Sequence, residues 1–241
     1  MPIAASQDAG ELTPKGRATR ERIVDAAAGL MFEHGVAGTS LDDVKAAAGV
    51  SSSQLYHYFK DKRALAIAVI QHQTEAILAG QQPHLAHLDS IAAFRAWRDV
   101  LIGIRRDLRC RGGCPIGSLA SELAESDARA RAELSSGFDQ WESAIRDGLR
   151  AMKARGELTA EARPDDLATA VLAAVQGGIL LTQVHRDPKP MEIALDTMID
   201  HIESMVVRPA PASAAAATNR TATARKSASR PSKARRKGTR R

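Results

Sequence analysis

Apolar residues recur at helical spacing along most of the chain. The first apolar stripe lies within residues 17–33 and includes Ile23, Ala27, Leu30 and Met31. Further stripes predict helices at about 41–48, 51–59, 61–79, 90–108, 127–155, 163–184 and 190–206. Glycine and proline mark the breaks between them, as at Gly112-Gly113 and Asp187-Pro188. The pattern therefore predicts an all-α fold.

Residues 39–63 read as two short helices joined by a glycine turn. Ser40 can cap the first helix, and Asp43 can reach back to Ser40, which is a capping box. Gly49 then ends that helix, since glycine easily adopts the left-handed conformation of a helix C-terminus. The second helix is expected to begin at Ser51 or Ser52. This arrangement is typical of a helix-turn-helix, although ordinary helical proteins also contain such corners.

The second of these helices has the polar surface that a DNA-reading helix needs. Such a helix enters the major groove by its N-terminal end, where small polar residues let the backbone approach the bases. Gln54 can make a bidentate contact to adenine. The residues placed where phosphates should pass are Tyr56, His57, Lys60 and Lys62. These details favour DNA binding over a structural corner.

The segment from Arg17 to Leu65 resembles the DNA-binding domain of the TetR family of bacterial regulators, most clearly in GVSSSQLYHYFKDKRAL. The resemblance implies a helical homodimer, with three N-terminal helices for an operator and a larger helical domain for a small ligand and dimerisation. It also implies that Thr39 and Ser40 lie beside a phosphate and that serines of the second helix face bases. The expected DNA contacts are Thr39, Ser40, Ser51, Ser52, Ser53, Gln54, Tyr56, His57, Lys60 and Lys62.

Charge divides the chain into unequal parts. The formal net charge is +6, but residues 208–241 hold eleven Lys or Arg and no acid. Residues 13–66 have eight basic and six acidic side chains, whereas residues 67–207 have 15 and 20. We therefore expect four parts: a disordered arm at 1–12, a helix-turn-helix DNA-binding domain at 13–63, a ligand-binding and dimerisation domain at 64–207, and a disordered basic tail at 208–241.

The tail contains no apolar residue larger than alanine, so it cannot bury enough surface to offset its chain entropy. Eleven positive charges on a flexible chain should bind phosphates without reading sequence. The alternative interpretation is a solubilising appendage.

The last two predicted helices have more apolar surface than one small core needs. A second subunit could cover the excess by forming a four-helix bundle across a two-fold axis. Gly177 and Gly178 would allow close approach of helices there, or would simply weaken the helix that contains them.

Residues 109–126, RCRGGCPIGSLASELAES, resemble the loop and short helix in the ligand-binding domain of the LmrA/YxaF-like branch of TetR regulators. That resemblance implies a small effector, often aromatic or amphipathic. The candidate pocket residues are Phe94, Trp97, Leu101, Cys114, Leu119, Phe138 and Trp141. Each could instead be simple core. Cys110 and Cys114 could form a redox pair, but no adjacent lysine or histidine activates them, which favours Cys114 as a small buried hydrophobe.

Several function classes are disfavoured. The sequence has no Gly-x-Ser-x-Gly elbow, no phosphate-binding glycine loop and no zinc-ligand spacing, so we expect neither an enzyme nor a cofactor. His84 and His87 are too few for a metal site and are interpreted as part of a solvated loop. No apolar run is expected to span a membrane. Two cysteines without a secretory signal pattern indicate a reducing cytoplasm. The resemblance to the TetR family implies a bacterial one, with nucleoid association when the protein binds DNA.

These observations predict a homodimeric, ligand-responsive regulator, most simply a repressor that a small-molecule effector releases from a palindromic operator. Two other hypotheses stay open. One is a DNA-organising protein that binds without sequence preference through its basic tail. The other is a small-molecule binding protein whose helix-turn-helix no longer reads DNA.

Overall fold

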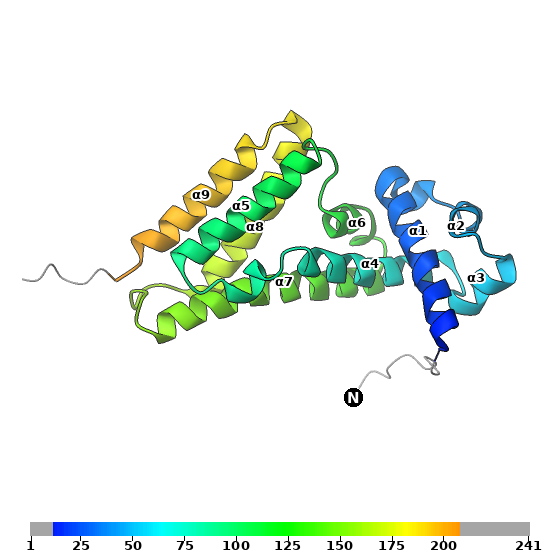
Figure 1. Cartoon of the computed structure of the whole chain (residues 1–241), viewed down its shortest axis with the longest axis horizontal. Helices are drawn as coiled ribbons and strands as arrows, with labels where there is room; N and C mark the ends of the chain where they lie inside the picture. Colours follow the sequence, from blue (N-terminus) through cyan, green and yellow to red (C-terminus); the bar gives the residue numbers. More distant parts are fainter. Residues whose placement is uncertain (1–11, 208–241) are drawn as a thin grey trace, which may run out of the picture. The chain divides into compact units, whose positions relative to one another are not determined.

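The computed structural model describes residues 12–207, and the predicted arm and basic tail, apart from Leu12, lie outside this range. Within it the backbone forms nine α-helices and one 3₁₀ helix, with no strand beyond an isolated bridge between Leu158 and Val206 (Figure 1). The all-α prediction is confirmed. The helices are α1 (Pro14–Gly38), α2 (Leu41–Ala48), α3 (Ser52–Tyr58), α4 (Lys62–Ala79), η1 (His84–His87), α5 (Ile91–Asp107), α6 (Pro115–Leu123), α7 (Ala128–Ala154), α8 (Pro164–His185) and α9 (Lys189–Ser204).

The ends of α2 follow from its capping residues. The Asp43 backbone N–H donates to Ser40 Oγ at 3.1 Å, and the Ser40 backbone N–H donates to Asp43 Oδ2 at 3.0 Å. Gly49 ends the helix at φ 61° and ψ 44°. Both features were predicted and are confirmed. A capping box of this kind stabilises a short helix by roughly 1 kcal/mol, which matters for a helix of only eight residues.

Helix α1 is longer than the predicted 17–33. It begins at Pro14, whose ring suits a first helical position, and it reaches Gly38 with an interruption at Gly35. Gly35 has φ 75°, a conformation that a side chain would strain. Gly35 is therefore a break within α1, after which one further helical turn leads into Thr39.

A continuous apolar core joins the helices. Helix α1 packs against α2, α4 and α6, and α4 also packs against α7. Helix α8 packs against both α7 and α9, while α5 covers α9 on another side. Figure 1 shows α6 beside α1 and next to the paired helices α4 and α7. Because the buried residues from α1 to α9 belong to one cluster, a boundary at residues 63 and 64 stays a prediction.

The segment around His84 and His87 differs from the solvated loop that we predicted. It forms η1, which packs against α5 and α7. Leu85 and Leu88 are each only 1% exposed, whereas His84 is half-buried and His87 is exposed. The prediction considered the histidines alone, and the leucines beside them are what anchor the segment.

Helix α8 corrects the expectation that no apolar run approaches a membrane-spanning length. Its 22 residues are long and apolar enough by length and composition alone. However, 44% of its most apolar window is buried within the protein, where α7 and α9 pack against it. A helix packed within a soluble protein passes the same test of length and composition, so α8 by itself is weak evidence for a membrane segment.

Candidate DNA interface and ligand pocket

The N-terminal end of α3 is held by a second capping box. The Gln54 backbone N–H donates to Ser51 Oγ at 3.2 Å, and the Ser51 backbone N–H donates to Gln54 Oε1 at 2.9 Å. Leu55, which is 1% exposed, and Phe59 pack inward. The other side chains near the front of α3 are consequently exposed to solvent.

The cap changes the expected role of Gln54. A bidentate contact to adenine uses both the oxygen and the nitrogen of the carboxamide. In this structure the oxygen already accepts the Ser51 N–H, so such a contact requires that hydrogen bond to open. A hydrogen bond of this type contributes about 0.5–1.5 kcal/mol, which is small beside a good bidentate base contact of about 1–3 kcal/mol. Gln54 is thus poised to exchange one partner for another.

Most of the predicted DNA contacts share the exposed surface of the helix-turn-helix. The exposed members are Ser40, Ser51, Ser52, Ser53, Gln54, Tyr56, His57 and Lys60. Tyr56 has the large aromatic side chain among them, and it is 57% exposed. Lys62 is half-buried, and its ammonium group donates to the Ala37 carbonyl oxygen at 3.4 Å.

Thr39 is the exception and corrects the prediction. Its side chain is buried, and its hydroxyl donates to the Gly35 carbonyl oxygen at 2.9 Å. That bond satisfies a carbonyl left open where α1 breaks, so the Thr39 hydroxyl is not presented to a phosphate. Sequence spacing gave no sign of this backbone contact.

Two arginines of α1 have partners inside the protein. Arg20 lies over the Phe59 ring at 5.4 Å, which is a cation–π contact. Arg17 donates to the Leu12 carbonyl oxygen at 2.6 Å. Both therefore help to hold the end of α3 and the start of α1 in place.

Two polar contacts connect α1 and α4 to the rest of the protein. Glu122, near the end of α6, accepts the Val36 N–H at 2.8 Å and the Ala37 N–H at 3.5 Å, just after the break in α1. Arg63, at the start of α4, donates to Asp127 Oδ1 at 2.6 Å. Arg63 is also the main reason that the pKa of Asp127, the capping residue of α7, is lowered.

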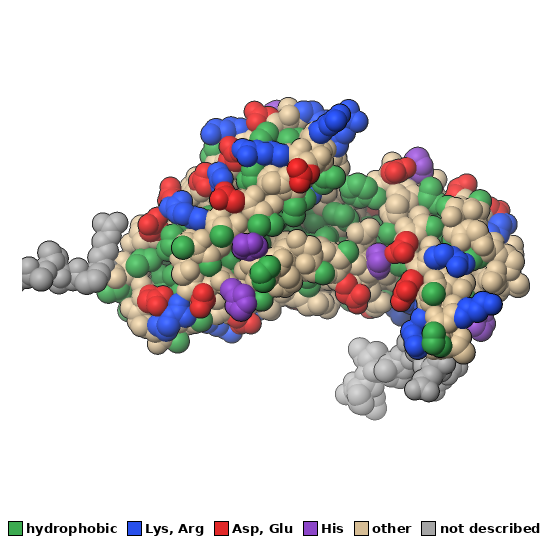
Figure 2. Space-filling view, viewed as in Figure 1, with side chains coloured by type: hydrophobic (Ala, Val, Ile, Leu, Met, Phe, Trp, Pro, Cys, Tyr) green, Lys and Arg blue, Asp and Glu red, His purple; other side chains and the backbone are tan. Residues whose placement is uncertain are grey.

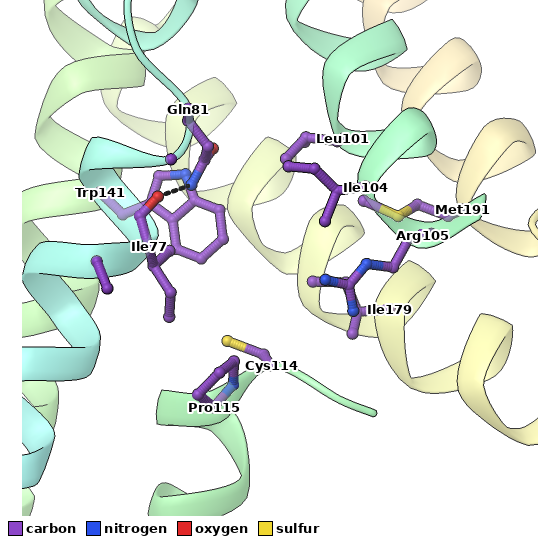
Figure 3. A pocket seen from close by; sticks show the side chains of 12 residues that line it. Ile77, Gln81, Leu101, Ile104, Arg105, Cys114, Pro115, Trp141, Ile179 and Met191 are labelled. Atoms are coloured by element: carbon purple, nitrogen blue, oxygen red, sulfur yellow. Dashed lines mark hydrogen bonds between the residues drawn. The ribbon is translucent and has the colours of Figure 1, made fainter. Parts of the chain in front are cut away.

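A pocket of about 270 Å³ lies among α4, α5, the start of α6, α7, α8 and α9 (Figure 3). Leu101, Cys114 and Trp141 are the predicted pocket residues that line it. The other lining residues are Ala76, Ile77, Gly80, Gln81, Ile104, Arg105, Pro115, Ile179 and Met191. The walls are therefore mainly apolar, with a few polar groups, as is usual for a small-molecule site.

The remaining predicted pocket residues lie elsewhere. Phe94 and Trp97 are fully buried in the core and pack edge to face at 6.4 Å. Trp97 supports the pocket indirectly, since its Nε1–H donates to Gln81 Oε1 at 2.9 Å. Leu119 lines a separate small hollow against α1, and Phe138 lines a groove beside α6 and α8. Aromatic character alone did not separate pocket from core.

Arg105 lines the pocket but was not among the predicted pocket residues, although the sequence contains an indication of its role. It follows Leu101 by four residues, so it falls on the apolar stripe of α5 and not on its solvated face. A charged residue on such a stripe indicates a buried polar function. Ile179 and Met191 come from helices distant in sequence, and no local pattern could have assigned them.

Cys114 behaves as a buried thiol. Burial raises its pKa, and this outweighs the opposing effects of hydrogen bonds and of the Arg105 charge. The thiolate is therefore disfavoured near neutral pH, which is not the environment of a reactive cysteine. Within residues 12–207, no three His, Cys, Asp or Glu side chains gather as a metal-binding group.

One face of α8 is apolar and exposed. Leu180, Leu181 and Val184 are 58%, 47% and 66% exposed, and Ile193 of α9 is 55% exposed. Ala173 and Gly177 precede the three α8 residues on the same face of the helix. We call these five residues of α8 the α8 stripe.

The two glycines of α8 have different surroundings. A Cβ atom on Gly178 would lie 3.0 Å from the Met191 Cα, so Gly178 permits α9 to approach α8 within one protomer. A Cβ atom on Gly177 would meet nothing within 4 Å. Gly177 therefore remains available to an outside partner.

Another part of the α9 surface carries ion pairs with α5. Arg95 pairs with Asp200 and Glu203, Arg98 with Asp196, and Arg106 with Glu192. Figure 2 shows the resulting mixture of basic and acidic side chains over α5 and α9. A surface of paired charges is typical of contact with solvent, whereas a contiguous apolar surface such as the α8 stripe is not.

Comparisons with known proteins agree with this architecture. Residues 23–69 match the family described as bacterial regulatory proteins, tetR family, and residues 90–198 match a tetracyclin repressor-like C-terminal domain. An uncharacterized HTH-type regulator from the lacX 3' region of Lactococcus lactis is 28% identical, covering 78% of this chain and 95% of its own length. The HTH-type transcriptional regulator LmrA of Bacillus subtilis is 26% identical, covering 72% and 90%.

Solved structures show the same fold. A TetR transcriptional regulator from Chloroflexus aurantiacus is 29% identical with a TM-score of 0.68, covering 80% of this chain and 98% of that one. The similarity spans both the helix-turn-helix and the larger helical region, and the matched families are regulators, not enzymes. The chain belongs to the TetR family of helix-turn-helix, DNA-binding transcriptional regulators.

Proposed function

We propose that this regulator is a repressor that binds a palindromic operator as a homodimer and is released from it by a small organic effector. The observation that carries the proposal is the position of α6. Its N-cap residue Cys114 and its first residue Pro115 line the pocket, and Glu122 near its other end binds the backbone of α1. One short helix thus connects the pocket to the helix-turn-helix.

An effector would act through differential stability. If it binds more tightly to one placement of α6, it favours the matching placement of α1 and of the recognition helix α3. Two recognition helices must lie about 34–36 Å apart to enter successive major grooves, so a small displacement per subunit weakens operator binding. Couplings of this kind are typically about 1–3 kcal/mol, or roughly 5- to 150-fold in affinity.

At the DNA, we propose that Ser52, Ser53 and Gln54 face bases. The proposed phosphate contacts are Ser40, Ser51, Tyr56, His57, Lys60 and Lys62. Thr39 is omitted because its hydroxyl is engaged within the protein. The proposed domains are residues 13–63 for DNA and 64–207 for ligand and dimerisation, and the proposed location is the bacterial cytoplasm, with nucleoid association in the DNA-bound state.

Selection of bound genomic fragments in vitro tests the proposal against the DNA-organising alternative. The full chain and a 1–207 truncation would be compared near physiological salt. We expect both to select one palindromic site, while the truncation shows a weaker dependence of affinity on salt because eleven basic residues are removed. Binding without sequence preference that disappears with the tail would support a DNA-organising protein instead.

Gln54→Ala is expected to weaken binding to the selected site by about 5- to 100-fold and to relax the base preference at one position in each half-site. Part of the loss comes from the cap, because Gln54 Oε1 accepts the Ser51 N–H. Gln54→Glu retains an oxygen that can accept the Ser51 N–H, but a carboxylate has no N–H to donate to adenine N7, so this variant separates the two causes. Unchanged base preference in both variants would exclude Gln54 as a base-reading residue.

Glu122→Gln tests the connection through α6. The amide should hold the Val36 N–H more weakly than the carboxylate does, so we expect amide exchange at Val36 to accelerate roughly three- to tenfold. Operator affinity should change as well, by about threefold. Glu125→Gln is the control, since Glu125 is exposed just beyond the same helix. Unchanged exchange and affinity in Glu122→Gln would argue against this route of coupling.

A further inference from the structure

The pocket contains a cationic group that no acidic side chain neutralises. Arg105 is half-buried, and among residues 12–207 it forms no ion pair. The arginines near it on α5 differ, since Arg98 pairs with Asp196 at 2.8 Å and Arg106 with Glu192 at 2.7 Å. The unpaired arginine is therefore the one that lines the pocket.

The contacts that Arg105 does make leave most of its donors free. Its Nη1 lies 3.5 Å from the Gly112 carbonyl oxygen and 3.4 Å from the Gly113 carbonyl oxygen. Hydrogen bonds of good geometry are about 2.9–3.0 Å long, so these two are weak. A guanidinium has five N–H donors and remains charged in proteins. Burial lowers the pKa of Arg105, which reports the cost of holding a charge in this environment.

A second donor is also unsatisfied. Trp141 is 2% exposed, lines the same pocket, and its buried Nε1–H has no partner among the described residues. The Gln81 oxygen, an obvious acceptor, is already bonded to Trp97. In Figure 3 Arg105 extends from α5 on one side of the pocket, with Trp141 on the other. The pocket thus offers donors and apolar walls, but few acceptors.

We propose that the pocket binds a small organic anion, a carboxylate attached to an apolar body, with Arg105 as its counter-ion. This inference rests on the proposed effector role of the pocket. The carboxylate would accept hydrogen bonds from the Arg105 guanidinium, and the apolar body would contact Ile77, Leu101 and Ile179. A volume of about 270 Å³ suits a small molecule, since it is close to the lower end of the range of about 300–1,000 Å³ that is usual for ligand pockets.

Matched pairs of acids and amides test the charge directly. Benzoate, cinnamate and octanoate would be titrated beside benzamide, cinnamamide and octanamide at pH 7.5, using the full chain. The protein has two tryptophans, one of which lines the pocket, so tryptophan fluorescence reports occupancy and calorimetry gives the affinity. We expect at least one acid to bind about tenfold or more tightly than its amide.

Three variants locate the effect. Arg105→Gln should remove the preference for the acid while the amide affinity stays within about threefold, and Arg105→Lys should retain part of the preference. Arg106→Gln is the matched control, because Arg106 is exposed and paired with Glu192. Thermal unfolding of each variant establishes that it is folded. Equal binding of acids and amides, full acid affinity in a folded Arg105→Gln, or no binding by any of the acids would overturn the inference.

Operator release, measured in parallel, separates this inference from the proposed function. An acid that binds through Arg105 but leaves the operator occupied supports an anion site and contradicts effector control. Release of the operator by the neutral amides, without any preference for the acids, supports effector control and overturns the anion site.

Discussion

Replacing Val184 with glutamate is expected to convert the proposed homodimer into monomers and to lower operator affinity by at least about 100-fold. Val184 is 66% exposed in the protomer and belongs to the α8 stripe. If a second subunit packs against the α8 stripe, the variant buries an unpaired carboxylate in the interface. Because the interface has two-fold symmetry, the same carboxylate of the second subunit lies nearby and repels it. A monomer would contact only one half-site and would lose the gain from binding two sites together.

Sedimentation measures the oligomeric state, and a mobility shift with the selected operator measures affinity. Leu108→Glu is the matched control, since Leu108 is 49% exposed but lies at the end of α5, outside the α8 stripe. The control should remain dimeric. A dimeric Val184→Glu with normal operator affinity would show that the subunits meet through a different surface.

The ends of the helices were predictable because the signals that set them are local. Ser40, Asp43 and Gly49 lie within ten residues of each other, and each acts on the backbone of α2 itself. The helical turn that follows the break at Gly35 had no such local signal. That turn is stabilised by Glu122, which is 86 residues away from Val36 in sequence. Long-range contacts of this kind leave no periodic pattern to detect.

The pocket was only partly predictable for a related reason. Helical spacing shows which side chains face inward, but it does not distinguish a side chain in the core from one beside a cavity. Trp97 and Trp141 both lie on buried stripes, yet only Trp141 lines the pocket. The difference depends on how α4, α5 and α8 meet. Arg105 is the exception, since a charge on an apolar stripe was visible in the sequence itself.

Gly148→Ala is expected to destabilise the protein by about 3 kcal/mol or more, which would lower the midpoint of thermal unfolding by roughly 6–12 °C. A Cβ atom on Gly148 would lie 2.0 Å from the Leu88 carbonyl oxygen and 2.6 Å from its carbonyl carbon. These are backbone atoms, so no side-chain rotation can relieve the overlap. Either α7 or the segment after η1 must move.

Gly29→Ala is the control that isolates the clash. Gly29 lies inside α1, is exposed, and a Cβ atom there would meet nothing within 4 Å. In an open helix the change from glycine to alanine stabilises by about 0.5–1 kcal/mol, so the two variants should move in opposite directions. Both would be measured at one protein concentration, because the stability of a dimer depends on it.

The result bears on the pocket as well as on stability. Gln81, three residues before η1, accepts a hydrogen bond from Trp97 of α5, and Gln81 lines the pocket. If η1 packs as closely against α7 as it does in this structure, Gly148→Ala must displace η1 and the pocket wall at Gln81. The variant should then also lower the affinity of any ligand that binds in the pocket. A Gly148→Ala protein as stable as the parent would mean that η1 can shift away from α7 at little cost, and the pocket would then be far more adaptable than its packing indicates.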